Sequence, residues 1–434
     1  MIPPARPAVP WRDAVRVWAR VALQSFGGPA GQIAVVHRIV VEEKRWLGER
    51  RFLHALSYCM LLPGPEAQQL TTYVGWLLHG VRGGLVAGTL FILPGFVSIL
   101  ALSVLYAEYG HTAWVAGVFF GLKPAVIAIV LAAVTRLRRG ALRGRGGLGL
   151  AAGAFAAIFC FGIPFPLVVL AAGLLGLMLP GAPVPDLEEP SVTVSRPSTA
   201  GAVRTTLFWL GVWLVPPALL LAGLGPGHVL VREAVFFSKA AVVTFGGAYA
   251  VLSYVAQQAV EAYQWLAPGQ MLDGLGMAET TPGPLIQVVQ FVGFMGAYSH
   301  PGGMEAVVTG VLGSVVTTWV TFAPCFLFVF VGAPYVEYLR SWRKLTSALA
   351  AITAAVAGVV VNLAVWFALH TLFGELERVG VGPASLLLPV PGSLDWRALL
   401  ITLAAIVAVF RFRIGMMPVL GGSALLGLLL HRVF

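Results

Sequence analysis

Two stretches of the sequence, LLPGPEAQQL at 61–70 and TTPGPLIQVV at 280–289, carry the same Pro-Gly-Pro tripeptide inside otherwise apolar surroundings. They lie 219 positions apart, since Pro63 corresponds to Pro282 and Gly64 to Gly283. Proline and glycine end or kink helices, so prolines on both sides of a glycine predict a break within an apolar helical segment. The repetition of this break predicts a chain built from two related halves.

The same spacing relates further landmarks along the chain. It maps Phe26-Gly27-Gly28 onto Phe245-Gly246-Gly247, Trp46 onto Trp265, and Gln68 onto Gln287. An insertion of 11 residues in the second copy then changes the spacing to 230, which maps Pro94 onto Pro324. We therefore divide the chain into an N-terminal transport half, a Pro-rich acidic linker, an extra connecting transmembrane helix and a C-terminal inverted transport half, with the bounds 1–180, 181–203, 204–224 and 225–434.

The composition indicates a membrane protein. Of the 434 residues, 58% are hydrophobic and 11% are charged, whereas soluble proteins carry about 25% charge. This composition excludes a cytosolic enzyme. The net charge is +10, but the excess of apolar residues leaves no hydrated basic face for nucleic acid. Weakly charged stretches, most of them near the roughly 20 residues of a spanning helix, predict an all-α polytopic fold with spans at 82–106, 113–135, 147–161, 164–180, 204–224, 303–332, 345–371, 397–410 and 414–431.

The basic residues predict how the halves are oriented. The loop at 136–146 is rich in arginine, whereas its second-half counterpart carries Glu375 and Glu377; conversely, 340–344 is basic and its counterpart at 107–112 is not. Basic loops lie on the cytoplasmic side, so we place 136–146 and 340–344 in the cytoplasm of an inner-membrane, multi-pass protein. Equivalent loops then lie on opposite sides, which is typical of the inverted-topology repeats of secondary transporters.

The glycine and proline motifs then fall within hairpins that enter the membrane and return. We expect broken or re-entrant helical hairpins at 11–41, 52–80, 229–258 and 270–299. Irregular backbone at membrane depth is tolerated only where it is buried in protein or lines a watery cavity. The alternative is that the glycines merely permit close helix packing.

A helix that begins within the membrane presents unpaired N–H groups and the positive end of its dipole, which is an anion-binding arrangement. Pro65 and Pro284 suit the first helical turn, and Gln68 and Gln287 can donate side-chain hydrogen bonds to an oxyanion. The full set of candidate substrate-binding residues is Phe26, Gly27, Gly28, Pro63, Gly64, Pro65, Gln68, Lys123, Phe245, Gly246, Gly247, Thr281, Pro282, Gly283, Pro284 and Gln287.

Charged residues within apolar segments are further candidates. Lys123 lies in the middle of 113–135, where a lysine costs about 2.5–3.5 kcal/mol. A bound anion could compensate it; the alternatives are that the side chain snorkels to the interface or pairs with a carboxylate such as Glu66. Arg20 and Lys239 occupy equivalent positions and either steer anions at an entrance or anchor the chain at the interface. Glu66 and Glu279 adjoin the tips and are candidates for proton coupling, although Glu66 could instead cap its helix.

Several classes of site find no support in the sequence. Cys59, Cys160 and Cys325 are far apart, and the histidines form no ligand pair, so we expect no metal and no disulfide. Neither a nucleotide-binding loop nor a hydrolase motif is present. The chain is therefore not expected to be an enzyme or to need a cofactor.

These motifs resemble the chromate ion transporter (CHR) family. The run from Phe26-Gly27-Gly28-Pro29 to Leu62-Pro63-Gly64-Pro65-Glu66 is similar to its N-terminal signature, and Thr280-Thr281-Pro282-Gly283-Pro284 with Phe322-Ala323-Pro324 to its C-terminal one. The resemblance implies a long-chain, two-domain member that exports chromate, with sulfate as a structural analogue.

Together, the residues and the resemblance predict a secondary transporter that moves an oxyanion by alternating access, coupled to an ion or to the membrane potential. An anion channel, or a carrier of sulfate or another oxyanion, is the alternative. The expected partners are the small oxyanion and membrane lipids, not nucleic acid, and the sequence leaves a homodimer open.

Overall fold

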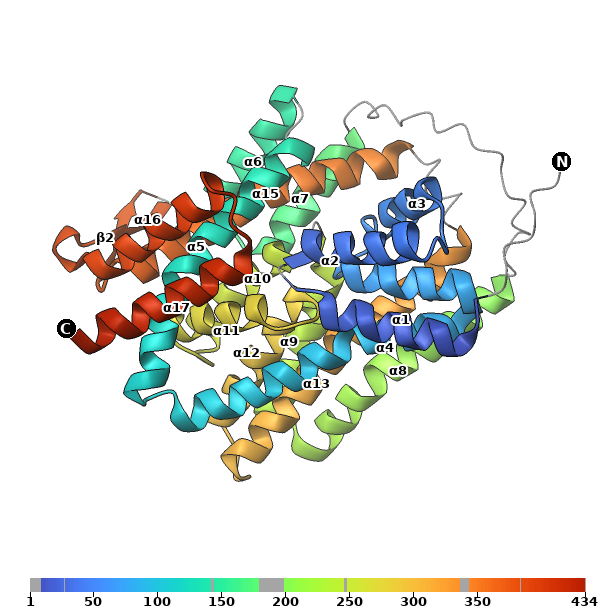
Figure 1. Ribbon diagram of the computed structural model, residues 1–434, viewed down its shortest axis with the longest axis horizontal. Helices are drawn as coiled ribbons and strands as arrows, with labels where there is room; N and C mark the ends of the chain where they lie inside the picture. Colours follow the sequence, from blue (N-terminus) through green and yellow to red (C-terminus); the bar gives the residue numbers. More distant parts are fainter. Residues whose placement is uncertain are drawn as a thin grey trace.

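The computed structural model describes residues 9–26, 28–141, 144–178, 199–245, 248–335, 343–382 and 384–433. The chain is mostly helical (Figure 1). The N-terminal half contains α1 (Trp11–Gln24), α2 (Gly28–His37), the π-helix η1 (Arg38–Glu43), α3 (Glu49–Cys59), α4 (Glu66–Tyr109), α5 (Ala113–Ala141), α6 (Gly144–Phe159) and α7 (Phe165–Met178).

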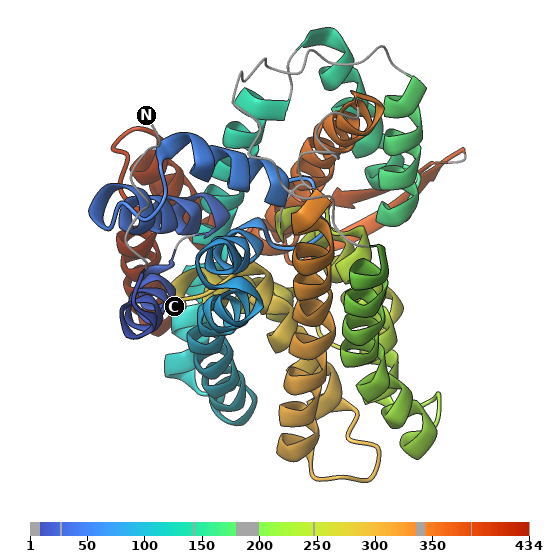
Figure 2. The same ribbon diagram turned by 90° about the vertical axis from the view of Figure 1, so that its right-hand side faces the viewer.

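The helix α8 (Thr199–Leu224) connects the halves and lies beside α13 (Figure 2). The C-terminal half contains α9 (Val229–Val243), α10 (Ala248–Gln257), the π-helix η2 (Gln258–Ala262), α11 (Pro268–Thr280), η3 (Leu285–Gln287), α12 (Val288–Ser299), α13 (Ala306–Gly332), η4 (Ala333–Tyr335), α15 (Arg343–Leu372), β1 (Leu376–Val381), β2 (Ala384–Pro389), η5 (Pro391–Ser393), α16 (Trp396–Phe410) and α17 (Met416–Val433).

Long apolar helices identify a membrane protein. Among the described residues, five helices are long and apolar enough to cross a membrane: 66–109, 113–135, 199–224, 306–332 and 347–372. Four of them overlap the predicted spans 113–135, 204–224, 303–332 and 345–371, whereas α4 joins the predicted span 82–106 to part of the predicted hairpin 52–80. The shorter apolar helices α6, α7, α16 and α17 occupy the other predicted ranges.

Some predicted boundaries change. The predicted linker lies outside the described residues up to 198, and its last residues, 199–203, belong to α8. The predicted basic loop at 136–146 is largely helical, because α5 continues to Ala141 and α6 begins at Gly144.

The backbone repeats the 219-residue relationship closely. Both halves contain a helix that stops, restarts and ends in a π-helix, η1 in the first half and η2 in the second. Each π-helix leads into a turn with a left-handed residue, Arg45 (φ 52°) or Gln264 (φ 54°), which are equivalent positions. A tryptophan, Trp46 or Trp265, follows directly.

The insertion of 11 residues changes the next segment. In the first half, α4 runs on through a kink at His79 and Gly80, where Gly80 has a φ of 62°. In the second half the equivalent helix is interrupted, and α12 and α13 are joined by the loop at 300–305.

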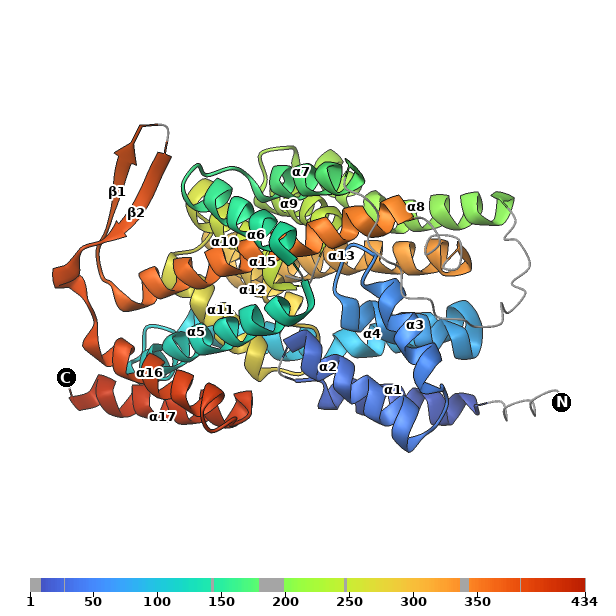
Figure 3. The same cartoon turned by 90° about the horizontal axis from the view of Figure 1, so that it is seen from above.

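The last helices of the two halves are exchanged. α5 packs against α16 and α17 of the other half, whereas its equivalent, α15, packs against α6 and α7 (Figure 3). Glycines make the contacts close: Gly121 lies against Ser423 of α17, and Gly358 lies against Ala151 of α6. Each half therefore completes its core with helices from the other.

The prediction of an all-α fold is wrong at one place. The segment after α15 forms an antiparallel hairpin of β1 and β2, which projects from one end of the molecule (Figure 3). Alternation of Val379 and Val381 with small or polar residues favours a strand, and Gly382, with a φ of 60°, permits the tight turn.

Candidate functional site

The first helix of each half ends in the same conformation. Ser25 has φ −85° and ψ 82°, and its equivalent, Thr244, has φ −76° and ψ 85°. The hydroxyl group of Ser25 donates to the carbonyl of Val21, and that of Thr244 to the carbonyl of Ala240, both at 2.6 Å. These hydroxyl groups satisfy carbonyls that the end of a helix otherwise leaves without a partner.

Reciprocal hydrogen bonds join these breaks to the tips of the other half. The Gly283 N–H donates to the Ser25 carbonyl at 2.9 Å, and the Gly64 N–H donates to the Thr244 carbonyl at 2.7 Å. Each Pro-Gly-Pro tip is therefore bound to the helix break of the opposite half, and the two contacts are equivalent under the repeat.

Both tips require glycine. Gly64 has a φ of 127° and Gly283 a φ of 106°, which L-residues rarely adopt. A Cβ on Gly64 would lie 2.7 Å from Gln69 Nε2, and one on Gly283 would lie 3.1 Å from the Cα of Gly95. The tips are thus closely packed in this conformation.

Two helices begin at these tips without a side-chain cap. Pro65 precedes α4 and Pro284 precedes η3, and neither helix start has a side-chain cap hydrogen bond. The expectation that these prolines lie inside the first turn is wrong by one residue: both are N-cap residues with extended backbone. The first N–H groups of both helices are directed at the tips.

Glutamines surround the tips, with their amide groups used within the protein. Gln68 Nε2 donates to Thr72 at 3.0 Å, and Gln287 Nε2 donates to Gln290 at 3.1 Å. Within the described part of the chain, the Oε1 atoms of both are buried and have no hydrogen-bond partner. Each Nε2 carries two hydrogens, so these bonds use one of the two donors of each amide group.

Two further glutamines bind the carbonyl groups of the tips, and the sequence reasoning did not single them out. Gln69 Nε2 donates to the Pro63 carbonyl and Gln32 Nε2 to the Gly283 carbonyl, both at 2.7 Å. Gln32 comes from the opposite half, so it adds a side-chain contact to the same junction. Their position as uncharged polar residues within apolar segments was the signal available in the sequence.

The two breaks also lie close to each other. A Cβ on Gly28, the first residue of α2, would lie 3.5 Å from the hydroxyl oxygen of Tyr249 in α10 and 4.0 Å from Glu279. Tyr249 donates to Glu279 at 2.6 Å, which places a buried carboxylic group beside the start of α2. The predicted residues Gly27, Gly246 and Gly247 lie outside the described residues.

The remaining tip residues occupy the same region. Glu66 is the first residue of α4, and Thr281 is the C-cap of α11. Phe26 and Phe245 follow Ser25 and Thr244 directly and are half-buried, and Pro63 and Pro282 precede the tip glycines.

Lys123 is placed away from the tips. Its Nζ lies 3.3 Å from Asp273 Oδ2, and Asp273 also accepts a 2.7 Å hydrogen bond from Tyr106. Asp273 lies seven residues before the end of α11, about 10 Å along the helix. In this conformation the carboxylate that pairs with Lys123 is thus Asp273 rather than Glu66.

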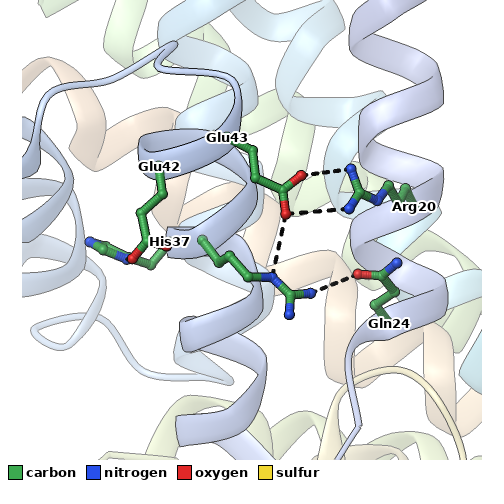
Figure 4. Close-up of polar contacts among 6 residues, drawn as sticks. Arg20, Gln24, His37, Glu42 and Glu43 are labelled. Carbon is green, nitrogen blue, oxygen red and sulfur yellow. Dashed lines mark hydrogen bonds and ion pairs between the residues drawn. The ribbon is translucent and has the colours of Figure 1, made fainter.

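The predicted entrance residues differ between the halves (Figure 4). Arg20 Nη1 lies 2.7 Å from Glu43 Oε2, and Arg38 donates to Gln24 at 2.8 Å. These contacts connect α1 to η1 within about one turn of the first break. The equivalent of Arg20, Lys239, is exposed on α9.

The long apolar helices define a helical membrane protein, in which the helix breaks of each half contact the tips of the other. The family model for the chromate transporter matches residues 12–177 and 231–428. The chain therefore belongs to the chromate transporter family, a family of transporters rather than of enzymes.

Individual relatives agree with this assignment. The chain is 32% identical over 344 residues to a chromate transport protein of Pseudomonas aeruginosa, covering 79% of this chain and 77% of the relative. It is 28% identical over 373 residues to the chromate transport protein of Cupriavidus metallidurans, covering 84% of each. The uncharacterized transporter YwrB of Bacillus subtilis is 31% identical over 122 residues, covering 28% of this chain and 61% of the relative. No solved structure matches.

The ion pair between Lys123 and Asp273 gives a prediction about stability. Asp273→Ala leaves the Lys123 charge without its partner, so we expect the free energy of unfolding to fall by about 1–3 kcal/mol. The double variant Lys123→Ala/Asp273→Ala should recover part of this loss. Thermal unfolding in detergent measures the stability of the parent and of these variants, with Asp13→Asn, a change of an exposed residue, as the control. An Asp273→Ala variant as stable as the parent would contradict the prediction.

Proposed function

We propose that this protein is a secondary transporter that exports a dianionic oxyanion, chromate, across the inner membrane by alternating access. The observation that carries the proposal is the pair of reciprocal junctions, in which uncapped helix starts and left-handed glycines from both halves meet in the protein interior. Helix starts of this kind favour anions through N–H groups and the helix dipole.

The oxyanion would bind between the two tips, close to Gly28, Gly64 and Gly283. It would bind there once the tips part, because the closely packed glycines leave no space for a side chain in this conformation. Parting the tips breaks the bonds to Ser25 and Thr244, and a bound anion would accept from the released N–H groups instead. Substrate binding and opening are then one event, as a carrier requires.

The halves would have inverted topology, which contacts of α15 support. Its start lies against the end of α7, at Ala348 and Gly176, and the hairpin after it pairs with the loop before α7, through Ser385 N–H and the Cys160 carbonyl at 2.8 Å. α15 thus begins at the end of the bundle where α7 finishes. Its equivalent, α5, finishes at that end, because α6 and α7 form the next hairpin.

The anion would approach along α1. Arg12, Arg16, Arg20 and Gln24 are exposed and spaced four residues apart, so they form one stripe that ends at the first break. The equivalent positions on α9 are Val231, Val235, Lys239 and Val243. A stripe with three arginines requires water, whereas the exposed Val235 suits lipid and Val231 is buried in the protein, so the first half would supply the entrance in this conformation.

Coupling would involve the carboxylic groups next to the tips. Glu66 begins α4, and Glu279 accepts from Tyr249 beside Gly28. An ionised carboxylate near a bound dianion is repelled by it, so binding of chromate would favour proton uptake at these groups.

Chromate flux into everted membrane vesicles tests the proposal, with sulfate as competitor and with imposed pH gradients. We expect saturable, pH-dependent uptake in the parent protein. Conductance that does not saturate and does not respond to the pH gradient would indicate a channel, and sulfate uptake without chromate uptake would reassign the substrate.

Substitution of the tip glycines tests, in this assay, whether both tips form the anion site. Gly64→Ala and Gly283→Ala each force an L-residue into a left-handed conformation, at a cost of about 1–2 kcal/mol, and crowd the site, so we expect at least about a tenfold loss of flux from either. Gly162→Ala is the matched control, since Gly162 has a φ of 61° but open space around it. Full activity of one tip variant would contradict a site shared by both tips.

Labelling of single cysteines tests the inverted topology. Trp114→Cys and Lys344→Cys lie at equivalent, exposed positions at the starts of α5 and α15. In a background that lacks Cys59, Cys160 and Cys325, a membrane-impermeant maleimide should label the two from opposite sides of the membrane. Labelling from the same side would refute the inversion.

The arginine stripe predicts a change in affinity for transport. Arg16→Gln should raise the KM for chromate roughly threefold and leave kcat unchanged, because a steering charge acts before the anion is bound. Arg204→Gln, an exposed arginine on α8, is the control. An unchanged KM, or a fall in kcat alone, would remove Arg16 from the entrance.

A further inference from the structure

Glu233 is a fully buried acid in the second turn of α9. It is 0% exposed, and within the described part of the chain neither carboxyl oxygen has a hydrogen-bond partner. It lies eleven residues before the break at Thr244 on a straight helix, so it does not belong to the tips. The proposed anion site gives it no role.

Glycines make the space that the carboxyl group fills. A Cβ on Gly296 of α12 would lie 2.8 Å from Glu233 Oε1, and one on Gly313 of α13 would lie 3.0 Å from Oε2. The Trp265 ring also contacts Gly296 from the same side, 2.9 Å from the position of its Cβ. The acid therefore faces the backbone of two helices and an aromatic ring.

The first half fills the equivalent place without an acid. The counterpart of Glu233 is Ala14, that of Gly296 is Leu77, and that of Gly313 is Gly83. In the second half the long side chain, Glu233, is on the first helix and the small residue is on α12. In the first half the small residue, Ala14, is on the first helix and the long side chain, Leu77, is on α4. A leucine at 233 would fill this volume equally well, so packing alone does not account for a carboxyl group.

Among the residues that the structure describes, no cation forms an ion pair with Glu233. Arg232 lies over the Tyr263 ring at 5.1 Å and so points elsewhere, and Tyr298 of α12 donates to Glu108. The other titratable groups on α9 and on the elements packed against it are His228, Lys239, Arg204 of α8, Tyr249 and Tyr254 of α10, His300 after α12, and Glu305 and Cys325 of α13. An ionised carboxylate that is buried without a partner is strongly unfavourable, so the group carries a proton here.

Histidines lie between this acid and the surface. His300 Nδ1 bonds the carbonyl of Gly296, the same glycine that faces Glu233, at 3.0 Å. His228 caps the start of α9, five residues from Glu233, and contacts the loop at 300–305 through Gly302. The two imidazole side chains and the 300–305 loop make this end of the helix pack polar, which provides a route to water.

From this geometry we propose that Glu233 is a proton-binding site of the transporter, separate from the anion site. It is protonated in this conformation, and it loses the proton from its carboxyl oxygen to water at the 300–305 loop when α9 moves against α12 and α13. The coupling role rests on the proposed transport of chromate, whereas protonation in this conformation does not.

Infrared difference spectroscopy tests protonation without any substrate. Across a pH titration in lipid, the parent protein should show a carboxylic acid C=O band that shifts in heavy water, and Glu233→Gln should lack that band. Glu305→Gln, which removes an exposed carboxylate at the start of α13, is the control and should retain it. A spectrum of Glu233→Gln identical to that of the parent would overturn the proposal.

Proton movement during transport tests coupling. In vesicles with a trapped pH indicator, Glu233→Gln should lower the number of protons moved per chromate, because only the protons bound by Glu66 and Glu279 remain, and it should keep chromate-for-chromate exchange within about twofold of the parent. Glu233→Asp should restore the parent's ratio of protons to chromate. A ratio in Glu233→Gln equal to that of the parent would overturn the coupling role. If the parent moves no chromate, the proposed function fails, and the infrared result alone decides whether Glu233 holds a proton.

Discussion

The structure depends on how two interrupted helices satisfy their backbone inside an apolar protein. Ser25 and Thr244 end α1 and α9, and each offers a carbonyl that the helix no longer binds. The N–H groups of Gly283 and Gly64 fill these positions from the opposite half. Without water to replace them, unpaired backbone groups are very costly at membrane depth, so neither half is complete without the tip of the other.

The exchange of the last helices extends this dependence through the molecule. α5 is covered by α16 and α17, and α15 by α6 and α7, so the two halves cannot separate as rigid units. Motion for transport must therefore occur within this interlocked arrangement, where glycines such as Gly121 and Gly358 bring backbones into contact. The side chains break the symmetry that the backbone keeps: the arginine stripe on α1 and the buried Glu233 on α9 each occur in one half alone.

Sequence reasoning located the breaks and the tips because proline and glycine act through local backbone geometry. It located the apolar helices because hydrophobic length is a property of the chain. It left partners open where they come from distant segments. For Lys123 it allowed a bound anion or a carboxylate such as Glu66, and the carboxylate that pairs with Lys123 in the structure is Asp273. The hairpin of β1 and β2 was missed because strong apolar helices on both sides dominated the interpretation.

The sequence by itself determined that the chain is duplicated and apolar and that its helices are interrupted at four repeated positions, because these features follow from motif spacing and composition. Only the tertiary structure decided that each tip binds the break of the other half and that Gln32 and Gln69 bind the tip carbonyls. It alone also decided that Glu233 is buried with no hydrogen-bond partner in the described part of the chain. The physical reason is that hydrogen bonding and desolvation depend on which segments meet in space, and residues 219 positions apart meet only after the chain has folded.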